Sequence, residues 1–154
     1  MREGFLGTAA PFHADLVLLL ELTMGLALFA GAVLARRQKF RSHAWCQSAV
    51  VVLNSALIAM LMLPTFSHRV WPRLPQKLGK SYYALATAHA GLGAIVECAA
   101  LYILLAAGTT LMPEKLRLTR YKLWMRAVLI SWWLVILLGV ATYARWYIPS
   151  SFRR

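Results

Sequence analysis

Four long apolar stretches constrain the fold of this 154-residue chain more than any other feature of its sequence. A helix of about 20 residues crosses a hydrocarbon core of roughly 30 Å, and each stretch is at least that long. Short connections between such helices place consecutive spans antiparallel. The sequence therefore predicts an all-α integral membrane protein, a single up-down bundle of four transmembrane helices. The expected spans cover residues 12–35, 44–66, 82–107 and 123–147.

The charge balance, 17 Lys and Arg against 5 Asp and Glu, fits this interpretation. The basic side chains flank the apolar stretches and do not form one stripe, which argues against nucleic acid as a partner. Basic ends suit a lipid bilayer with anionic headgroups. We expect an integral protein of the bacterial cytoplasmic (inner) membrane. The compact basic loops after the first and third spans favour a cytoplasmic position for those loops, with both termini outside.

One pattern, His-Ala-x-Leu-x4-Glu, occurs at residues 13–21 and again at 89–97. A two-helix unit used twice in parallel would produce such an internal duplication, and chance is the alternative in a chain this rich in Ala and Leu. In either case the first and third spans run in the same direction. We therefore expect His13 and His89 on the same side of the bilayer, with the glutamate of each copy roughly 12 Å further along its helix.

Ionisable side chains inside the spans are the first candidates for function, because a membrane interior tolerates them only with partners or a task. Alternating topology places His13, His68 and His89 on one side and His43 on the other. Three imidazoles at one end of a bundle can ligate haem iron or copper, so these three form the candidate metal site. Contact with lipid headgroups is the alternative, and it suits His43 and His68 better than His89.

Two carboxylates and one aromatic ring complete the candidate set. Glu21 and Glu97 either accept hydrogen bonds across helices or take part in a proton or quinone pathway. The neighbouring donors that could satisfy them are Thr23, Asn54 and Ser55. Trp132 lies near the middle of the fourth span, where packing competes with contact to a porphyrin or quinone ring. The candidate cofactor-binding residues are His13, His89 and Trp132.

The fourth span reads Trp132-x6-Gly139-x3-Tyr143-x3-Tyr147. With histidines that open and close the second span and one inside the third, the chain resembles a family of small four-helix membrane proteins over residues 12–147. That family is catalogued as domain of unknown function 420 and includes proteins implicated in maturation of haem-copper terminal oxidases. The polar positions that the resemblance marks are His43, His68, His89, Trp132, Gly139 and Tyr143.

Three hypotheses of function follow. The first is a small membrane subunit or assembly factor of a respiratory electron-transfer complex of the terminal-oxidase type, which holds haem or copper through histidines. The second is a structural subunit that packs against a larger membrane complex without a cofactor. The third is a b-type cytochrome that exchanges electrons with quinone, for which His13 and His89 are the only pair expected at matching depth. Haem b, copper and no cofactor all stay open, and we do not expect an enzyme acting on a soluble substrate.

Overall fold

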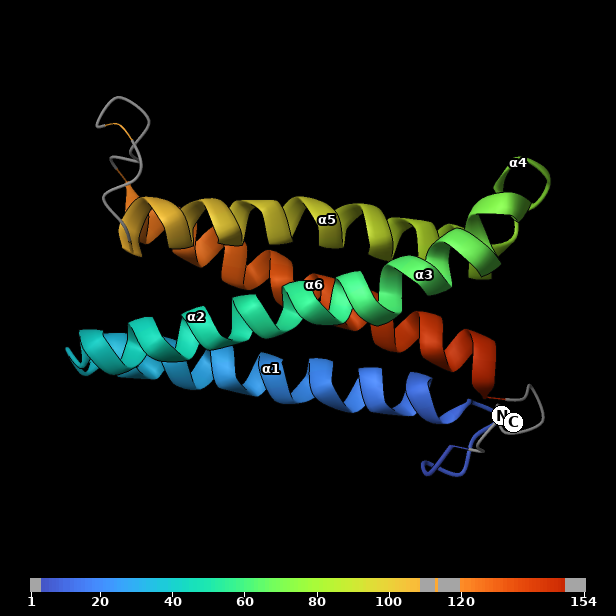
Figure 1. Cartoon of the computed structure of the whole chain (residues 1–154), viewed down its shortest axis with the longest axis horizontal. Coiled ribbons are helices and arrows are strands. Elements are labelled where there is room, and N and C mark those ends of the chain that lie inside the picture. Colours follow the sequence, from blue (N-terminus) through green and yellow to red (C-terminus); the bar gives the residue numbers. More distant parts are fainter. Residues whose placement is uncertain (1–3, 109–112, 114–119, 149–154) are drawn as a thin grey trace.

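The computed structural model describes residues 4–108, 113 and 120–148 of the chain. In these ranges it contains four helices that are each long and apolar enough to cross a membrane (Figure 1). This confirms the all-α four-helix bundle. The long helices are α1 (Phe12–Arg36), a continuous helix over Phe40–Lys77, α5 (Ser81–Gly108) and α6 (Tyr121–Tyr147).

The helix over Phe40–Lys77 differs most from the sequence prediction, which ended the second span at residue 66, just after Pro64, and placed a loop after it. Proline lacks an N–H, and its ring clashes with the carbonyl four residues earlier in a regular helix. Wider π-helical turns on both sides of Pro64 accommodate this mismatch, so the helix bends and continues. Its successive parts are α2 (Phe40–Leu57), η1 (Ile58–Met62), α3 (Leu63–Thr65), η2 (Phe66–Val70), η3 (Trp71–Arg73) and α4 (Leu74–Lys77).

The helices pack as two hairpins, α1 with α2 and α5 with α6, which join through contacts of α1 with α6 and of α2 with α5. α1 and α2 lie together near their connection and separate toward the other end, where the bent helix approaches the start of α5 (Figure 1). The backbone N–H of Ala9 donates to the carbonyl of Tyr147, at 3.2 Å. The start of α1 and the end of α6 therefore lie at the same end of the bundle.

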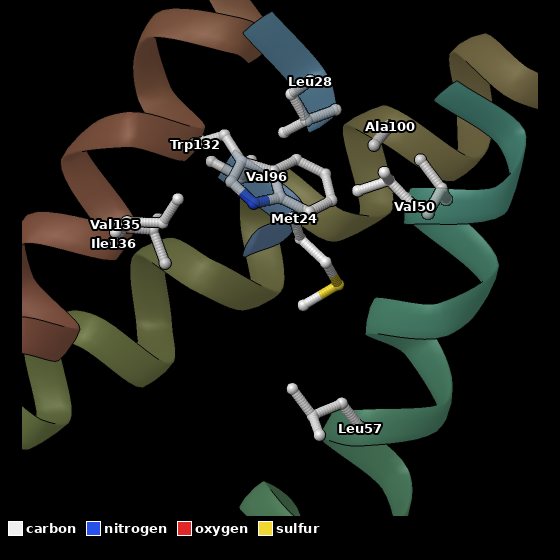
Figure 2. Packing of buried hydrophobic residues seen from close by; sticks show 10 residues of the cluster. Met24, Leu28, Val50, Leu57, Val96, Ala100, Trp132, Val135 and Ile136 are labelled. Atoms are coloured by element: carbon white, nitrogen blue, oxygen red, sulfur yellow. The ribbon is translucent and has the colours of Figure 1, made fainter. Parts of the chain in front are cut away.

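The main core lies in the middle of the bundle, where all four long helices contribute buried apolar side chains (Figure 2). At Gly25 of α1, an added Cβ would lie 2.7 Å from Ile136 Cδ1. A side chain at this position would make Ile136 shift, so glycine favours the close packing of α1 on α6. The buried residues of this core are Met24, Leu28, Val50, Val51, Leu57, Val96, Ala100, Trp132, Val135 and Ile136.

The outer surface of the bundle differs from that of a soluble bundle. Large apolar side chains in the middle of the helices face outward, among them Leu26, Ile95 and Ile130 with exposed fractions of 65%, 68% and 71%. The carboxylates in the described part of the chain, in contrast, are all buried. Lipid solvates exposed apolar side chains and does not solvate charge. The arrangement therefore indicates an integral membrane protein.

Candidate functional site

A cavity of about 560 Å³ lies inside the bundle, between α1, the bent second helix, α5 and α6. This volume is in the range of sites that hold small organic molecules or cofactors. Most of its wall is apolar, with Val17, Ile58 and Ile136 as examples. The polar residues that line it are His13, Glu21, Asn54, Thr65, Thr87, His89, Glu97, Thr142, Tyr143 and Tyr147.

Glu21 of α1 and His89 of α5 both line this cavity, and both approach Gly139 of α6. An added Cβ on Gly139 would lie 3.0 Å from both Glu21 Oε2 and His89 Cε1. Glu21 Oε2 and His89 Cε1 are therefore separated by at most twice 3.0 Å. Glycine at position 139 allows this close approach, because a Cβ there would make the carboxylate or the imidazole shift by a few tenths of an ångström.

The backbone of α6 fixes the tautomer of His89. Its Nδ1 lies 3.0 Å from the carbonyl oxygen of Val135, and a carbonyl oxygen only accepts. In the neutral ring the proton is therefore on Nδ1, and Nε2 carries a lone pair. A histidine held in this way can accept a hydrogen bond or bind a metal through Nε2.

Glu21 has an exposed fraction of only 8%, and within the described residues no group donates a hydrogen bond to it. No fully buried side-chain oxygen or nitrogen of the described residues lacks a partner, so the Glu21 carboxyl opens onto the cavity, where water or a ligand can donate to it. Residues kept in such a state inside a membrane bundle are typical of functional sites. Glu21 is therefore a candidate for a functional role in this cavity.

Glu97 lies in the same cavity but has partners. Asn54 Nδ2 donates to one carboxylate oxygen at 2.8 Å, and Ser55 Oγ donates to the other at 2.5 Å. This matches the alternative in which a glutamate accepts hydrogen bonds across helices. Thr23 does not contribute, because its hydroxyl donates to the carbonyl of Leu19 in its own helix. Glu97 therefore has a structural role that ties α5 to α2.

A third buried carboxylate was not singled out by the sequence. Asp15 is fully buried and accepts hydrogen bonds from the Tyr143 hydroxyl at 2.5 Å and from the Leu6 backbone N–H at 2.8 Å. The hydroxyl groups of Thr8 and Tyr143 lie 2.6 Å apart. This network fastens the segment before α1 to the end of α6. The only signal in the sequence was an aspartate at the start of an apolar span.

The predicted histidine set is only partly assembled. His13 and His89 line the cavity, whereas His68 is exposed and lies outside it. His43 is at the other end of the bundle, where its Nδ1 lies 2.8 Å from the Gly31 carbonyl oxygen. In the described ranges no three His, Cys, Asp or Glu side chains gather closely enough to hold a metal ion. The three-histidine metal site expected from topology is thus not formed, because the helix that carries His68 directs it outward.

The two copies of the His-Ala-x-Leu-x4-Glu pattern do not lie at equal depth. His89 meets Glu21, the last residue of the first copy, and not its first residue. His13 precedes Glu21 by eight residues, which is roughly 12 Å along a helix. The expectation of matching depth for His13 and His89 is therefore wrong, because packing sets α5 about two turns out of step with α1.

Trp132 is buried in the core and also lines the cavity, so it has both the packing role and the cavity position considered for it. Gly139 and Tyr143 line the cavity as well.

Comparison of the chain with protein-family models, curated proteins and solved structures gives no match. The resemblance to the domain of unknown function 420 family stays a prediction. Of its marked positions, His89, Trp132, Gly139 and Tyr143 gather at the cavity, and His43 and His68 do not.

Proposed function

We propose that this chain is a small membrane subunit or accessory factor of a respiratory electron-transfer complex of the terminal-oxidase type. Its working part is the cavity around Glu21 and His89. The observation that carries the proposal is a carboxylate that receives no hydrogen bond from the described residues, near an imidazole with an open lone pair, both on a ligand-sized apolar space. Such a site inside a membrane is suited to binding a lipophilic redox molecule and to exchanging protons with it.

A copper site receives no support from the residues at the cavity. Copper in proteins is held by several imidazole or sulfur ligands, and such a group is not found in the described ranges.

A b-type cytochrome with paired axial histidines is a weaker candidate than the proposal. It requires His13 and His89 at one depth, and they are offset by about two helical turns. A haem held by one histidine fits the cavity better than a haem held by two. His89 would be its ligand through Nε2, with Trp132 beside the ring, and the haem would supply one-electron chemistry.

A purely structural subunit is the alternative of a different class. The outward apolar side chains suit contact with a larger membrane complex as well as contact with lipid. That hypothesis explains Glu97, whose hydrogen bonds join two helices, but it gives no reason for Glu21.

We propose that the chain lies in the bacterial cytoplasmic membrane. The compact basic loops favour an orientation with both termini outside.

The proposal can be tested by deleting the chain from its host and measuring oxygen consumption by isolated membranes with a quinol as electron donor. We expect the rate to fall to less than half, and to return when the wild-type chain is supplied. His89→Ala should fail to restore it at a normal protein level in the membrane. An unchanged rate in the deletion strain would refute the respiratory role. Full restoration by His89→Ala would favour the structural subunit.

A further inference from the structure

We propose that the cavity is a binding site for lipophilic organic cations of the quaternary ammonium or phosphonium class. This inference goes beyond the proposed function and does not rest on it, because it follows from the charge and the aromatic rings of the cavity wall. A cation bound here would compete with a redox molecule for the same space.

The wall carries carboxylates that no cationic side chain on it compensates. Glu21 has an exposed fraction of 8%, lines the cavity and receives no hydrogen bond from the described residues. Glu97 lies on the same wall, and its donors Asn54 and Ser55 are neutral. No lysine or arginine is among the described residues that line the cavity. In a site of low dielectric constant such a wall attracts a cation and repels an anion.

Arg69 of the bent helix is close to the cavity but does not line it. Its guanidinium group donates a hydrogen bond to the hydroxyl of Tyr147, which is eight residues beyond Gly139 on α6. Eight residues are roughly 12 Å along a helix. The charge of Arg69 is therefore held near the end of α6, and it does not pair with Glu21 at Gly139.

Proton exchange allows the site to accept a cation from either protonation state of Glu21. If this carboxyl group is protonated in the empty cavity, the cation replaces that proton, which passes to water. The other titratable residues on the wall are His13, His89, Glu97, Tyr143 and Tyr147. Binding is therefore best measured in mildly alkaline buffer, in which an ordinary imidazole is neutral.

Aromatic rings line the cavity on both sides of Gly139. Trp132 is about two helical turns before this glycine and Tyr143 about one turn after it, so both lie on one face of α6. The face of an aromatic ring attracts a cation, and quaternary ammonium ligands are commonly recognised in this way. A quaternary cation neither donates nor accepts a hydrogen bond. Its binding therefore does not depend on the donors that the wall also carries, such as the Tyr147 hydroxyl and the Trp132 indole N–H.

The cavity also has an apolar route from the membrane. Leu63 and Trp71 line it, yet their exposed fractions are 59% and 67%. Both belong to the bent second helix, on the part that separates from α1 (Figure 1). A cation that dissolves in lipid can enter at this place. A metal ion is a poorer candidate, because in the described ranges no three His, Cys, Asp or Glu side chains gather closely enough to hold one.

The test is equilibrium dialysis of the full chain in a neutral maltoside detergent, with empty micelles as the blank. The probes are similar in size and differ in charge: tetraphenylphosphonium is a cation, tetraphenylborate is an anion and triphenylphosphine oxide is neutral. We expect saturable binding of tetraphenylphosphonium, at least about tenfold tighter than that of triphenylphosphine oxide, because the carboxylates and the ring faces favour the cation. Tetraphenylborate should show no saturable binding. Equal affinity for the cation and the neutral probe, saturable binding of the anion, or no binding of the cation would overturn the proposal.

Glu21→Gln keeps the shape of the side chain and removes its charge. It should lower the affinity for tetraphenylphosphonium about tenfold and leave that for triphenylphosphine oxide unchanged. Thr23→Val on the exposed side of α1 is the matched control and should bind like wild type. Unchanged phosphonium affinity in the folded Glu21→Gln variant would contradict the role of Glu21. If that variant does not fold, the comparison of the three probes on the wild-type chain still decides.

The result is independent of the test of the proposed function. Respiration that depends on the chain, without binding of the cation, would reject this inference alone. Binding of the cation by a chain that respiration does not need would reject the proposed function alone.

Discussion

Glu21 and His89 come from two helices that pack mainly on other partners, yet their side chains meet at one glycine of a third helix. The carboxylate oxygen and the ring carbon are each 3.0 Å from the place where a Cβ of residue 139 would be. Three helices thus define one small polar centre in an apolar cavity. The position of α6 sets how closely the two groups approach.

Substitution of this glycine should destabilise the bundle. In Gly139→Ala the new methyl group forces Glu21 or His89 to shift, and we expect a loss of about 1–3 kcal/mol of unfolding free energy, as for other overpacked sites. The measurement is unfolding of the purified variant in detergent. Gly91→Ala is the control, because a Cβ at Gly91 meets nothing within 4 Å. It should be neutral or gain about 0.5–1 kcal/mol from helix propensity. Equal stability of the two variants would show that residue 139 is not crowded.

Asn54→Ala should weaken the contact between α2 and α5. The variant leaves one buried oxygen of Glu97 without its donor, which costs about 1–3 kcal/mol. The same unfolding assay measures this loss. Thr23→Val, which removes an exposed hydroxyl, should be close to wild type. A variant as stable as wild type would mean that water or Ser55 replaces the lost donor.

Tyr143→Phe should loosen the segment before α1 without unfolding the bundle. The change removes the hydroxyl that donates to Asp15 and contacts Thr8. Amide hydrogen exchange should become faster at Leu6, whose N–H bonds to the same aspartate, and stay slow in the middle of α6. Faster exchange throughout α6 would instead indicate that Tyr143 stabilises the whole helix.

The visible spectrum of the purified protein tests whether the cavity holds haem. We expect no Soret band that depends on His13, because this residue is about two turns from the level of His89. A Soret band lost in His89→Ala and kept in His13→Ala would establish haem on one histidine. Loss of the band in both variants would establish paired axial ligands and contradict the depth offset described above.

The apolar runs predicted the helices well, because membrane spans depend on length and composition, and both are local properties. The second span was the exception. A proline after an apolar run usually ends a helix, and only the π-helical turns around Pro64 allow it to continue. Such turns arise from the packing of the bent helix and leave no clear trace in the sequence.

The candidate site was predicted in its parts and not in its arrangement. Glu21 and His89 could be identified because charge inside an apolar run is costly. Their proximity depends on the register between α1 and α5, which is set by packing at Gly139. The repeated sequence pattern predicted a different pair, His13 with His89. The bond between Asp15 and Tyr143 joins residues 128 positions apart, and no local pattern predicts it.

The central claim is that the cavity itself, and not only the outer surface of the bundle, carries the function. Ala90 lines the cavity, whereas Ala107 is exposed and lies outside it. Phenylalanine at position 90 fills part of the space without changing Glu21 or His89. The most direct measurement is oxygen consumption by membranes of the deletion strain that carries Ala90→Phe or Ala107→Phe. We predict that Ala90→Phe fails to restore the rate at a wild-type protein level while Ala107→Phe restores it. Full restoration by Ala90→Phe would contradict the account.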